Sequence, residues 1–212
     1  MANDPSTSGY SESAQALIAQ YESVAFEDVH GPVLHLYPLA PASVLDIGAG
    51  TGRDAAALAR RGHAVTAVEP TPELAAWGRA NHPRSIRWID DRLPRLDAVL
   101  ALGERFDFIL LTAVWMHLDT AQQREAMRTI ASLAAPGGRI SMTLRHGPVP
   151  EGRRMFDVTG DDVSALAAGF GLQALHHAAA SDAQKRPDVS WTFLVLEAMT
   201  GGHRHQQSPT GL

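Results

Sequence analysis

The stretch that decides the fold is Val44-Leu45-Asp46-Ile47-Gly48-Ala49-Gly50-Thr51-Gly52. Its first four residues are a short, mostly apolar run, typical of a buried strand, and the three alternating glycines predict a tight loop. The alanine-rich segment 54–60 predicts a helix that ends at Gly62. Glycine lets a backbone approach a ligand without a Cβ clash, and the first turn of a helix offers unpaired N–H groups. The three elements together predict a site for a nucleotide-like ligand.

Strands and helices alternate along the rest of the chain. Apolar runs predict strands at 44–47, 64–68, 86–89, 106–111, 139–144, 172–176 and 191–196. Helical spacing of apolar residues predicts helices at 11–26, 54–60, 71–81, 121–133 and 161–168. This alternation indicates an α/β protein with a Rossmann-like, mostly parallel sheet of seven strands and helices on both faces. Ligands bind such sheets outside the carboxyl ends of the strands, where the glycine loop falls.

Composition limits the classes of function. The 212 residues carry a formal net charge of −5, which disfavours a large nucleic-acid-binding face. There is no cysteine, so disulfides, cysteine-ligated zinc and a cysteine nucleophile are excluded, and we predict no metal site. No apolar run is long enough to cross a membrane. We expect a cytoplasmic protein with one domain at 10–198, its residues 10–40 forming a helical lid, and disordered segments at 1–9 and 199–212.

The spacing of the glycines separates two classes of nucleotide-binding protein. Dinucleotide-binding loops have the pattern G-x-G-x-x-G, whereas this loop reads G-x-G-x-G with Asp46 two residues before its first glycine. From about residue 10 to 197 the chain resembles the class I S-adenosylmethionine-dependent methyltransferases, and most of all their small-molecule branch. The resemblance implies that S-adenosyl-L-methionine is the cofactor and that the last strand is antiparallel. It also implies that Asp46 contacts the cofactor's amino group, while Gly48, Ala49, Gly50 and Gly52 pass beneath the methionine and ribose.

Acidic residues follow the second and third predicted strands. Glu69, just before Pro70, ends the second strand, and a carboxylate there can accept hydrogen bonds from both ribose hydroxyls. The resemblance assigns Glu69 to the ribose, and we include Pro70 in the cofactor site. Asp90 and Asp91 follow the third strand, where the resemblance implies an acceptor for the adenine amino group. Asp90 is the favoured candidate as the first residue after the strand, and Asp91 remains open because it can instead cap a turn.

The end of the fourth strand is expected beside the reacting group. Thr112 and Ala113 leave the strand there and are predicted to line the cofactor, with Trp115 and Met116 as a pocket wall. The class implies a histidine at the position of His117, to orient the loop or to act on the substrate. DNA-modifying relatives carry an Asn/Asp-Pro-Pro-aromatic motif here, and this chain does not, so a DNA substrate is disfavoured.

A methyl acceptor that must lose a proton needs a base, and neutral histidine is available near pH 7. The candidates are His30, His117 and His146, although most histidines are solvated or capping residues. The substrate pocket is expected from the N-terminal helix, with Tyr21 and Phe26, and from the loop after the fifth strand. In that loop Arg145 and His146 are placed to hold an anionic group.

The sequence thus predicts an S-adenosylmethionine-dependent methyltransferase that acts on a small molecule. A protein or RNA methyltransferase would share the same core, and a non-catalytic cofactor-binding subunit would keep the loop but lose the pocket. An NAD-dependent oxidoreductase is disfavoured by the glycine spacing. The acceptor atom stays open, as does the choice between a monomer and a homodimer.

Overall fold

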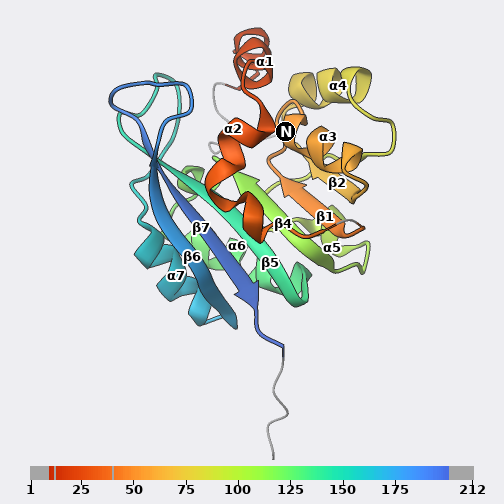
Figure 1. The fold of residues 1–212 in the computed structure, drawn as a ribbon, viewed down its shortest axis with the longest axis vertical. Helices are drawn as coiled ribbons and strands as arrows, with labels where there is room; N and C mark the ends of the chain where they lie inside the picture. Colours follow the sequence, from red (N-terminus) through yellow and green to blue (C-terminus); the bar gives the residue numbers. More distant parts are fainter. Residues whose placement is uncertain (1–9, 12, 40, 201–212) are drawn as a thin grey trace, which may run out of the picture.

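In the computed structural model, which describes residues 10–11, 13–39 and 41–200, one mixed sheet runs through the protein (Figure 1). Its order is β3-β2-β1-β4-β5-β7-β6. The strands are β1 (Ser43–Ile47), β2 (Ala64–Val68), β3 (Arg87–Ile89), β4 (Phe106–Thr112), β5 (Ala134–His146), β6 (Leu172–Ser181) and β7 (Ser190–Ala198). The segments 1–9 and 199–212 were predicted to be disordered; residues 1–9 and 201–212 lie outside the described residues, whereas residues 199 and 200 are described.

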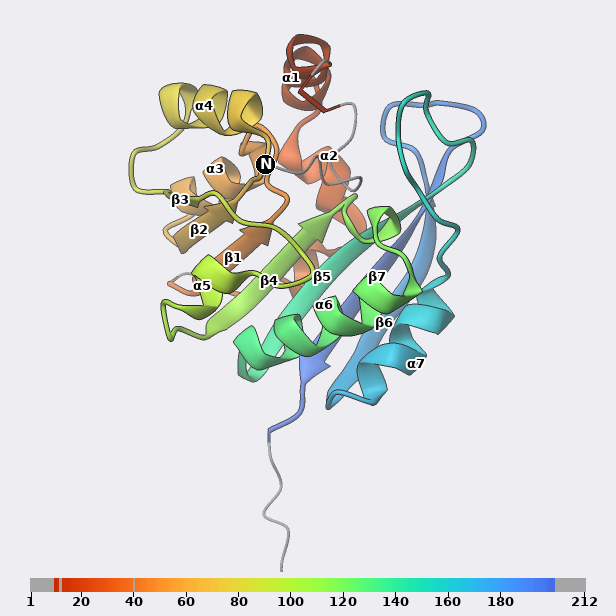
Figure 2. The ribbon, with the colours of Figure 1, turned by 180° about the vertical axis from the view of Figure 1, so that it is seen from behind.

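Helices cover both faces of the sheet, as Figures 1 and 2 show from opposite sides. They are α1 (Ala14–Glu22), α2 (Phe26–His30), α3 (Arg53–Arg60), α4 (Pro72–Asn81), α5 (Asp97–Leu100), α6 (Thr120–Leu133) and α7 (Gly160–Ala168), with 3-10 helices η2 (Gly31–Leu36) and η3 (Trp115–His117). Helices α2 and α3 lie on one face, and α5, α6 and α7 lie on the other. None of the helices within the described ranges has the length and apolar character needed to cross a bilayer.

Strand pairing confirms the predicted sheet. Strands β3, β2, β1, β4 and β5 pair in parallel, whereas β7 runs antiparallel between β5 and β6. Strand β1 is central, and Val44, Leu45 and Ile47 are at most 1% exposed because helices cover both of its sides. The chain crosses from the β1–β2–β3 half to the β4–β5 half beside β1, which creates the crevice where ligands bind in such sheets.

The N-terminal region differs from the single predicted helix 11–26. Helix α1 ends at Glu22, and α2 begins only at Phe26. The break at residues 23–25 turns the second helix toward the sheet, so Phe26 and His30 are 3% and 0% exposed. Helix α1 remains beyond the carboxyl ends of the strands, above the glycine loop (Figure 1).

Two further segments extend past the same edge of the sheet. The loop 147–159 follows β5 and the hairpin turn 182–189 joins β6 to β7, and both views show them side by side (Figures 1 and 2). The backbones of the two segments pack closely at Gly147 and Asp188. A Cβ added at Gly147 would lie only 2.0 Å from the carbonyl oxygen of Asp188. The Gln20 amide of α1 donates to Gln184 Oε1 in the hairpin at 2.9 Å. Helix, loop and hairpin together form a cover over the carboxyl edge.

Candidate functional site

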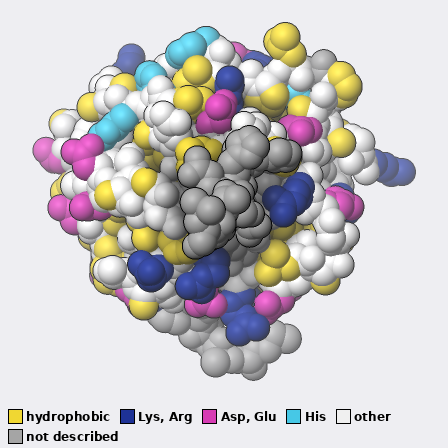
Figure 3. Space-filling model, turned by 90° about the horizontal axis from the view of Figure 1, so that it is seen from below, with side chains coloured by type: hydrophobic (Ala, Val, Ile, Leu, Met, Phe, Trp, Pro, Cys, Tyr) yellow, Lys and Arg dark blue, Asp and Glu magenta, His cyan; other side chains and the backbone are white. Residues whose placement is uncertain are grey.

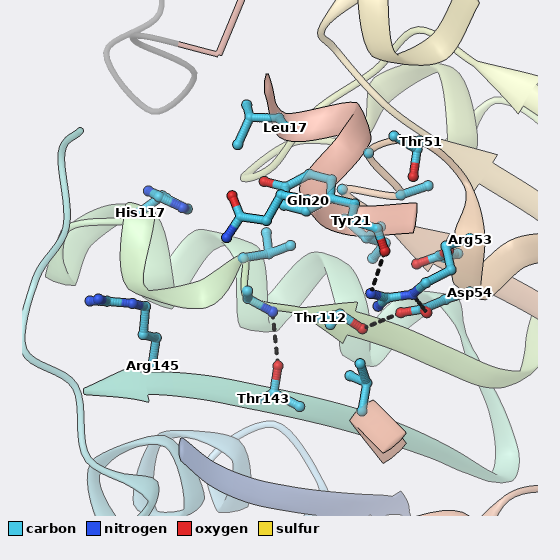
Figure 4. A pocket seen from close by; sticks show the side chains of 18 of the residues that line it. Leu17, Gln20, Tyr21, Thr51, Arg53, Asp54, Thr112, His117, Thr143 and Arg145 are labelled. Carbon is cyan, nitrogen blue, oxygen red and sulfur yellow. Dashed lines mark hydrogen bonds and ion pairs between the residues drawn. The ribbon is translucent and has the colours of Figure 1, made fainter. Parts of the chain in front are cut away.

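A cavity of about 550 Å³ lies between the carboxyl ends of the strands and this cover. The predicted residues among its walls are Tyr21, Asp46, Gly48, Ala49, Gly50, Glu69, Pro70, Asp91, Thr112, Ala113, His117 and Arg145. Figure 4 shows Thr51, Arg53 and Asp54 at one end of the cavity and His117 and Arg145 at the other. The fold therefore brings residues from β1, β2, β4, β5 and α1 to one enclosed space.

The glycine loop needs glycine for two separate reasons. Gly48 has φ +71°, and a Cβ there would lie 2.5 Å from Val114 Cγ2, so no side chain fits without displacing the β4 loop. Gly50 has φ +58°, and a Cβ there would lie 3.4 Å from the ring of Tyr21. Left-handed backbone is costly for residues with a side chain. The loop therefore brings bare backbone against the cavity, with the α1 aromatic ring packed directly over it.

Asp46 presents a hydrogen-bond acceptor that no described residue uses. Asp46 is 1% exposed, and its Oδ2 atom is buried with no hydrogen-bond partner among the described residues. Burial, and after it the negative charge of Asp54, raises the pKa of Asp46 well above its usual range. A buried acceptor without a donor is costly, and a ligand ammonium group would supply both the donor and the opposite charge. This orphaned atom fits the amino group of a methionine-derived cofactor.

The raised pKa predicts that ligand binding releases a proton. A bound ammonium favours the carboxylate form of Asp46, so affinity for S-adenosylhomocysteine should fall as pH drops below the raised pKa of the free protein. Calorimetry in two weakly acidic buffers with different ionisation enthalpies measures the protons released. The Asp46→Asn variant should release fewer protons than wild type when the ligand binds. Equal proton release by wild type and variant would show that Asp46 does not receive the ligand's ammonium group.

Glu69 holds the glycine loop to the end of β2. Its Oε2 accepts the backbone N–H of Gly50 and its Oε1 that of Thr71, both at 2.7 Å. The residue is 6% exposed, and burial raises the pKa of Glu69. A carboxylate has about four acceptor sites, so each oxygen keeps capacity for one hydroxyl of a vicinal diol. The loop-bracing contacts were not predicted from the sequence.

We expect Glu69→Ala to weaken S-adenosylhomocysteine binding by about 1.5–3 kcal/mol, the value of hydrogen bonds to a charged group, which is roughly a 10- to 150-fold loss. Glu69→Gln keeps one acceptor oxygen and should fall between the alanine variant and wild type. Calorimetric titration measures both. Wild-type affinity in the alanine variant would exclude Glu69 from the ribose site.

The two aspartates after β3 lie in different surroundings. Asp90 is exposed and is not part of the cavity wall, although it was the favoured adenine acceptor. Asp91 lines the cavity, but its carboxylate accepts the N–H groups of Arg92, Ala98 and Val99 at 2.8–3.1 Å. Asp91 therefore anchors the start of α5, as the turn-capping interpretation predicted. Of the two aspartates, Asp91 and not Asp90 lines the cavity.

A second buried carboxylate, Asp54, was missed in the sequence. It accepts from His30 Nε2 at 2.9 Å, Arg53 Nε at 2.7 Å and Thr112 Oγ1 at 3.0 Å (Figure 4 shows the last two). Burial opposes its ionisation, but the charges and hydrogen bonds of His30 and Arg53 prevail and hold the pKa of Asp54 far below its usual range. Asp54 lies one turn before Leu58 on α3, and both residues are buried. This helical spacing was the sequence signal that could have placed Asp54 on the buried face.

Of the four residues predicted at the end of β4, two line the cavity and two do not. Thr112 and Ala113 line the cavity, and the Ala113 N–H donates to Thr143 Oγ1 at 2.9 Å. Trp115 and Met116 were expected in the pocket wall, but they are 0% and 1% exposed and lie outside it. Helix η3 turns them into the hydrophobic interior instead.

Of the three candidate bases, only His117 lines the cavity among the described residues. His30 is buried, with its ring nitrogens against Asp54 and Tyr37, so it is a structural residue. His146 contacts Thr192 Oγ1 at 2.8 Å and is not in the cavity wall. Phe26, expected in the substrate pocket, also packs outside the cavity, against His30 at a ring separation of 4.7 Å.

The hydrogen bonds of His117 define its tautomer. Its Nδ1 lies 2.7 Å from the carbonyl oxygen of Arg154, which only accepts, so Nδ1 carries the proton. Its Nε2 therefore has a free lone pair, which accepts from the Tyr10 hydroxyl at 3.0 Å. Burial, and to a smaller extent the charge of Arg153, lowers the pKa of His117. The cavity thus contains a neutral imidazole whose basic nitrogen faces the cover.

The glycine loop, the orphaned Asp46 carboxylate and the Glu69 acceptor lie at successive strand ends, which is the arrangement expected of a class I methyltransferase site. Residues 21–177 match the model of a methyltransferase domain family, and the chain belongs to that family. The predicted superfamily and fold are therefore confirmed.

Individual relatives match only part of the chain in sequence. It is 34% identical over 101 residues to a ubiquinone biosynthesis O-methyltransferase of Methylobacterium sp. (strain 4-46), covering 48% of this chain and 40% of the relative. It is 28% identical over 147 residues to glycine N-methyltransferase of Rattus norvegicus, covering 58% and 50%. The chain thus spans half or less of the length of these two relatives.

Solved structures share the fold over most of both chains. A TehB-like S-adenosylmethionine-dependent methyltransferase from Corynebacterium glutamicum has a TM-score of 0.64 at 17% identity, covering 86% of this chain and 97% of its own. The 1,6-didemethyltoxoflavin-N1-methyltransferase of Burkholderia thailandensis, with bound 1,6-didemethyltoxoflavin and S-adenosylhomocysteine, has a TM-score of 0.61 at 22% identity. It covers 89% of each chain.

Proposed function

We propose that this protein is an S-adenosyl-L-methionine-dependent methyltransferase whose acceptor is a small molecule. The observation that carries the proposal is the buried, unpartnered Oδ2 of Asp46, a residue that lines the same cavity as the glycine loop and Glu69. These groups match the ammonium, the methionine backbone and the ribose of this cofactor in the order in which the strands present them. Family membership and the relatives that bind this cofactor or its product support the assignment.

Two contacts across the mouth of the cavity support a small acceptor. The Gln20–Gln184 hydrogen bond joins α1 to the β6–β7 turn, and the Arg153 guanidinium stacks over the Tyr10 ring at 3.6 Å. A polypeptide or RNA strand would have to displace these contacts, whereas a metabolite fits beneath them. These contacts favour a metabolite over the alternative of a protein or RNA substrate. Figure 3 shows the opposite face of the protein, away from the cavity, where both basic and acidic side chains of described residues are visible.

The roles of the residues follow from their places. The cofactor supplies a methyl group on a sulfonium, an electrophile that needs no covalent help from the protein. Asp46 and Glu69 orient the bound molecule, and the cover excludes water and holds the acceptor near attack geometry. His117 is proposed as the proton acceptor through Nε2, its basic nitrogen; the Tyr10 hydroxyl that occupies this nitrogen must relay the proton or be displaced by the substrate. A non-catalytic subunit would have no need for this enclosed acceptor space.

A labelled-methyl transfer screen tests the proposal. The protein is incubated with S-adenosylmethionine carrying a labelled methyl group and a metabolite extract, and labelled products are separated by size. We expect label in a low-molecular-weight product with wild type and none with Gly50→Val. Label only in protein or RNA would contradict a small acceptor, and no label in any fraction despite cofactor binding would favour the non-catalytic subunit.

A further inference from the structure

The two ends of the cavity carry opposite charges. Near the glycine loop, the wall contains the carboxylates of Asp46, Asp54 and Glu69 with Arg53 as a counter-charge. A separate group of charged wall residues comes from β5, the loop after it and the hairpin turn: Arg145, Arg153, Arg186 and Asp182. Asp182 is engaged by Arg186, at 2.8–2.9 Å through two guanidinium nitrogens. The acceptor end therefore keeps two arginine charges without a carboxylate partner among the described residues.

Arg153 is the less satisfied of these two arginines. Its Nη1 is buried and has no hydrogen-bond partner, while its guanidinium lies flat on Tyr10. Arg145 uses Nη1 to donate to the carbonyl oxygen of Pro148 at 2.8 Å, a neutral partner. Burial, and next the charge of Arg186, lowers the pKa of Arg145, and the charge of Asp182 opposes this shift only in part. A buried guanidinium donor without an acceptor is costly until a ligand supplies one.

The position of Arg153 ties this unused donor to the proposed base. Tyr10 lies between the two groups, stacked under Arg153 and donating its hydroxyl to His117 Nε2. An anionic group bound by Arg153 would therefore be separated from His117 by the Tyr10 side chain that both residues contact. The apolar wall nearby includes Leu17, Met155 and Trp191, which suits a flat apolar body attached to the anion.

We propose that the methyl acceptor is a carboxylic acid, bound as its carboxylate by Arg153 and Arg145. The planar guanidinium fork matches a carboxylate with two parallel hydrogen bonds. This inference rests on the proposed function and specifies its substrate class. His146, expected beside Arg145 as an anion ligand, is replaced in this role by Arg153. A carboxylate would also balance the charge of a cavity whose other end receives a cationic cofactor.

The test measures binding of simple probes to the protein saturated with S-adenosylhomocysteine. Benzoate and benzamide have nearly the same shape and differ in charge. We expect benzoate to bind at least about tenfold more tightly than benzamide, as a charge-assisted pair requires. Arg153→Gln should reduce benzoate affinity about tenfold or more and leave benzamide unchanged, and Arg145→Gln should act in the same direction.

The neighbouring Arg154 provides the matched control. Its side chain pairs with Asp119 at 2.8 Å and is not in the cavity wall. Arg154→Gln should leave benzoate affinity unchanged, because the substitution keeps the backbone carbonyl that contacts His117. Unchanged S-adenosylhomocysteine affinity in each variant shows that the fold is intact.

The outcomes separate the two proposals. If the wild type binds S-adenosylhomocysteine but does not distinguish benzoate from benzamide, the carboxylate site is overturned while the proposed function stands. An equal loss in Arg153→Gln and Arg154→Gln, or tighter binding of phenyl phosphate than of benzoate, also overturns it. If the wild type binds no S-adenosylhomocysteine, the proposed function fails and this inference fails with it.

Discussion

Replacing Gly50 by valine should abolish binding of S-adenosylhomocysteine. Gly50 has φ +58°, its Cβ position lies 3.4 Å from the Tyr21 ring, and its N–H donates to Glu69. A branched side chain would press on α1 and occupy space that the ligand needs. It would also strain the backbone that presents the N–H to Glu69, so steric and polar effects act together. Calorimetric titration should show no heat of binding at ligand concentrations that saturate the wild type.

Gly103 supplies the control for backbone strain alone. It has φ +67°, and a Cβ there meets nothing within 4 Å. Gly103→Val therefore carries a similar left-handed penalty, of the order of 1–2 kcal/mol, without touching the cavity. It should lower the melting temperature and keep wild-type affinity. If folded Gly50→Val also binds normally, the glycine loop does not contact the ligand.

Replacing Asp54 by alanine should cause the largest loss of stability. The change leaves the buried His30 and Arg53 nitrogens without their acceptor and removes the partner of Thr112. Breaking a buried ion pair costs about 3–5 kcal/mol, which corresponds to a melting temperature lower by roughly 6–20 °C for a chain of this size. Thermal unfolding followed by circular dichroism measures the shift.

The control pair lies on the surface. Asp97, like Asp54, lies in the first turn of a helix and accepts from an arginine, but the side chains of Asp97 and Arg95 are 66% and 69% exposed. Exposed pairs contribute about 0–1 kcal/mol, so Asp97→Ala should change the melting temperature little. Equal shifts in the two variants would refute a special role for the buried Asp54 network.

The same network predicts how stability depends on pH. The folded-state pKa of Asp54 is depressed, so its stabilisation is fully present above the unfolded-state pKa and is lost as pH falls through the folded-state value. Acid unfolding of Asp54→Ala should therefore be less steep than that of wild type. An identical pH dependence of the free energy of unfolding would contradict the depressed pKa.

The sequence predicted best what is determined locally. Strand β2 occupies the predicted residues 64–68, and the loop from Gly48 to Gly52 forms as expected because its positive φ angles need glycine. Pro72 begins α4 as predicted, since proline fits the first helical turn. Glu69 lines the cavity because its place is fixed by the end of β2, which pairs directly with β1.

The sequence predicted worst what depends on packing at a distance. Trp115 and Met116 follow the strand end directly, but η3 rotates them into the core, and no local signal fixes that rotation. Phe26 was expected at the end of the helix 11–26, yet the break before α2 turns Phe26 and His30 away from the cavity. The Tyr10, His117 and Arg153 cluster joins residues more than 30 positions apart, so its contacts appear only in the folded protein.

The most direct test of the central claim compares three ligands with the purified protein by calorimetry. S-adenosylmethionine, S-adenosylhomocysteine and NAD all contain an adenosine, but only the first two carry the amino group that Asp46 is placed to receive. We predict saturable binding of both methionine-derived ligands at one site per chain, and no binding of NAD at the same concentrations. Binding of NAD with no heat from either methionine-derived ligand would contradict the assignment of this cavity.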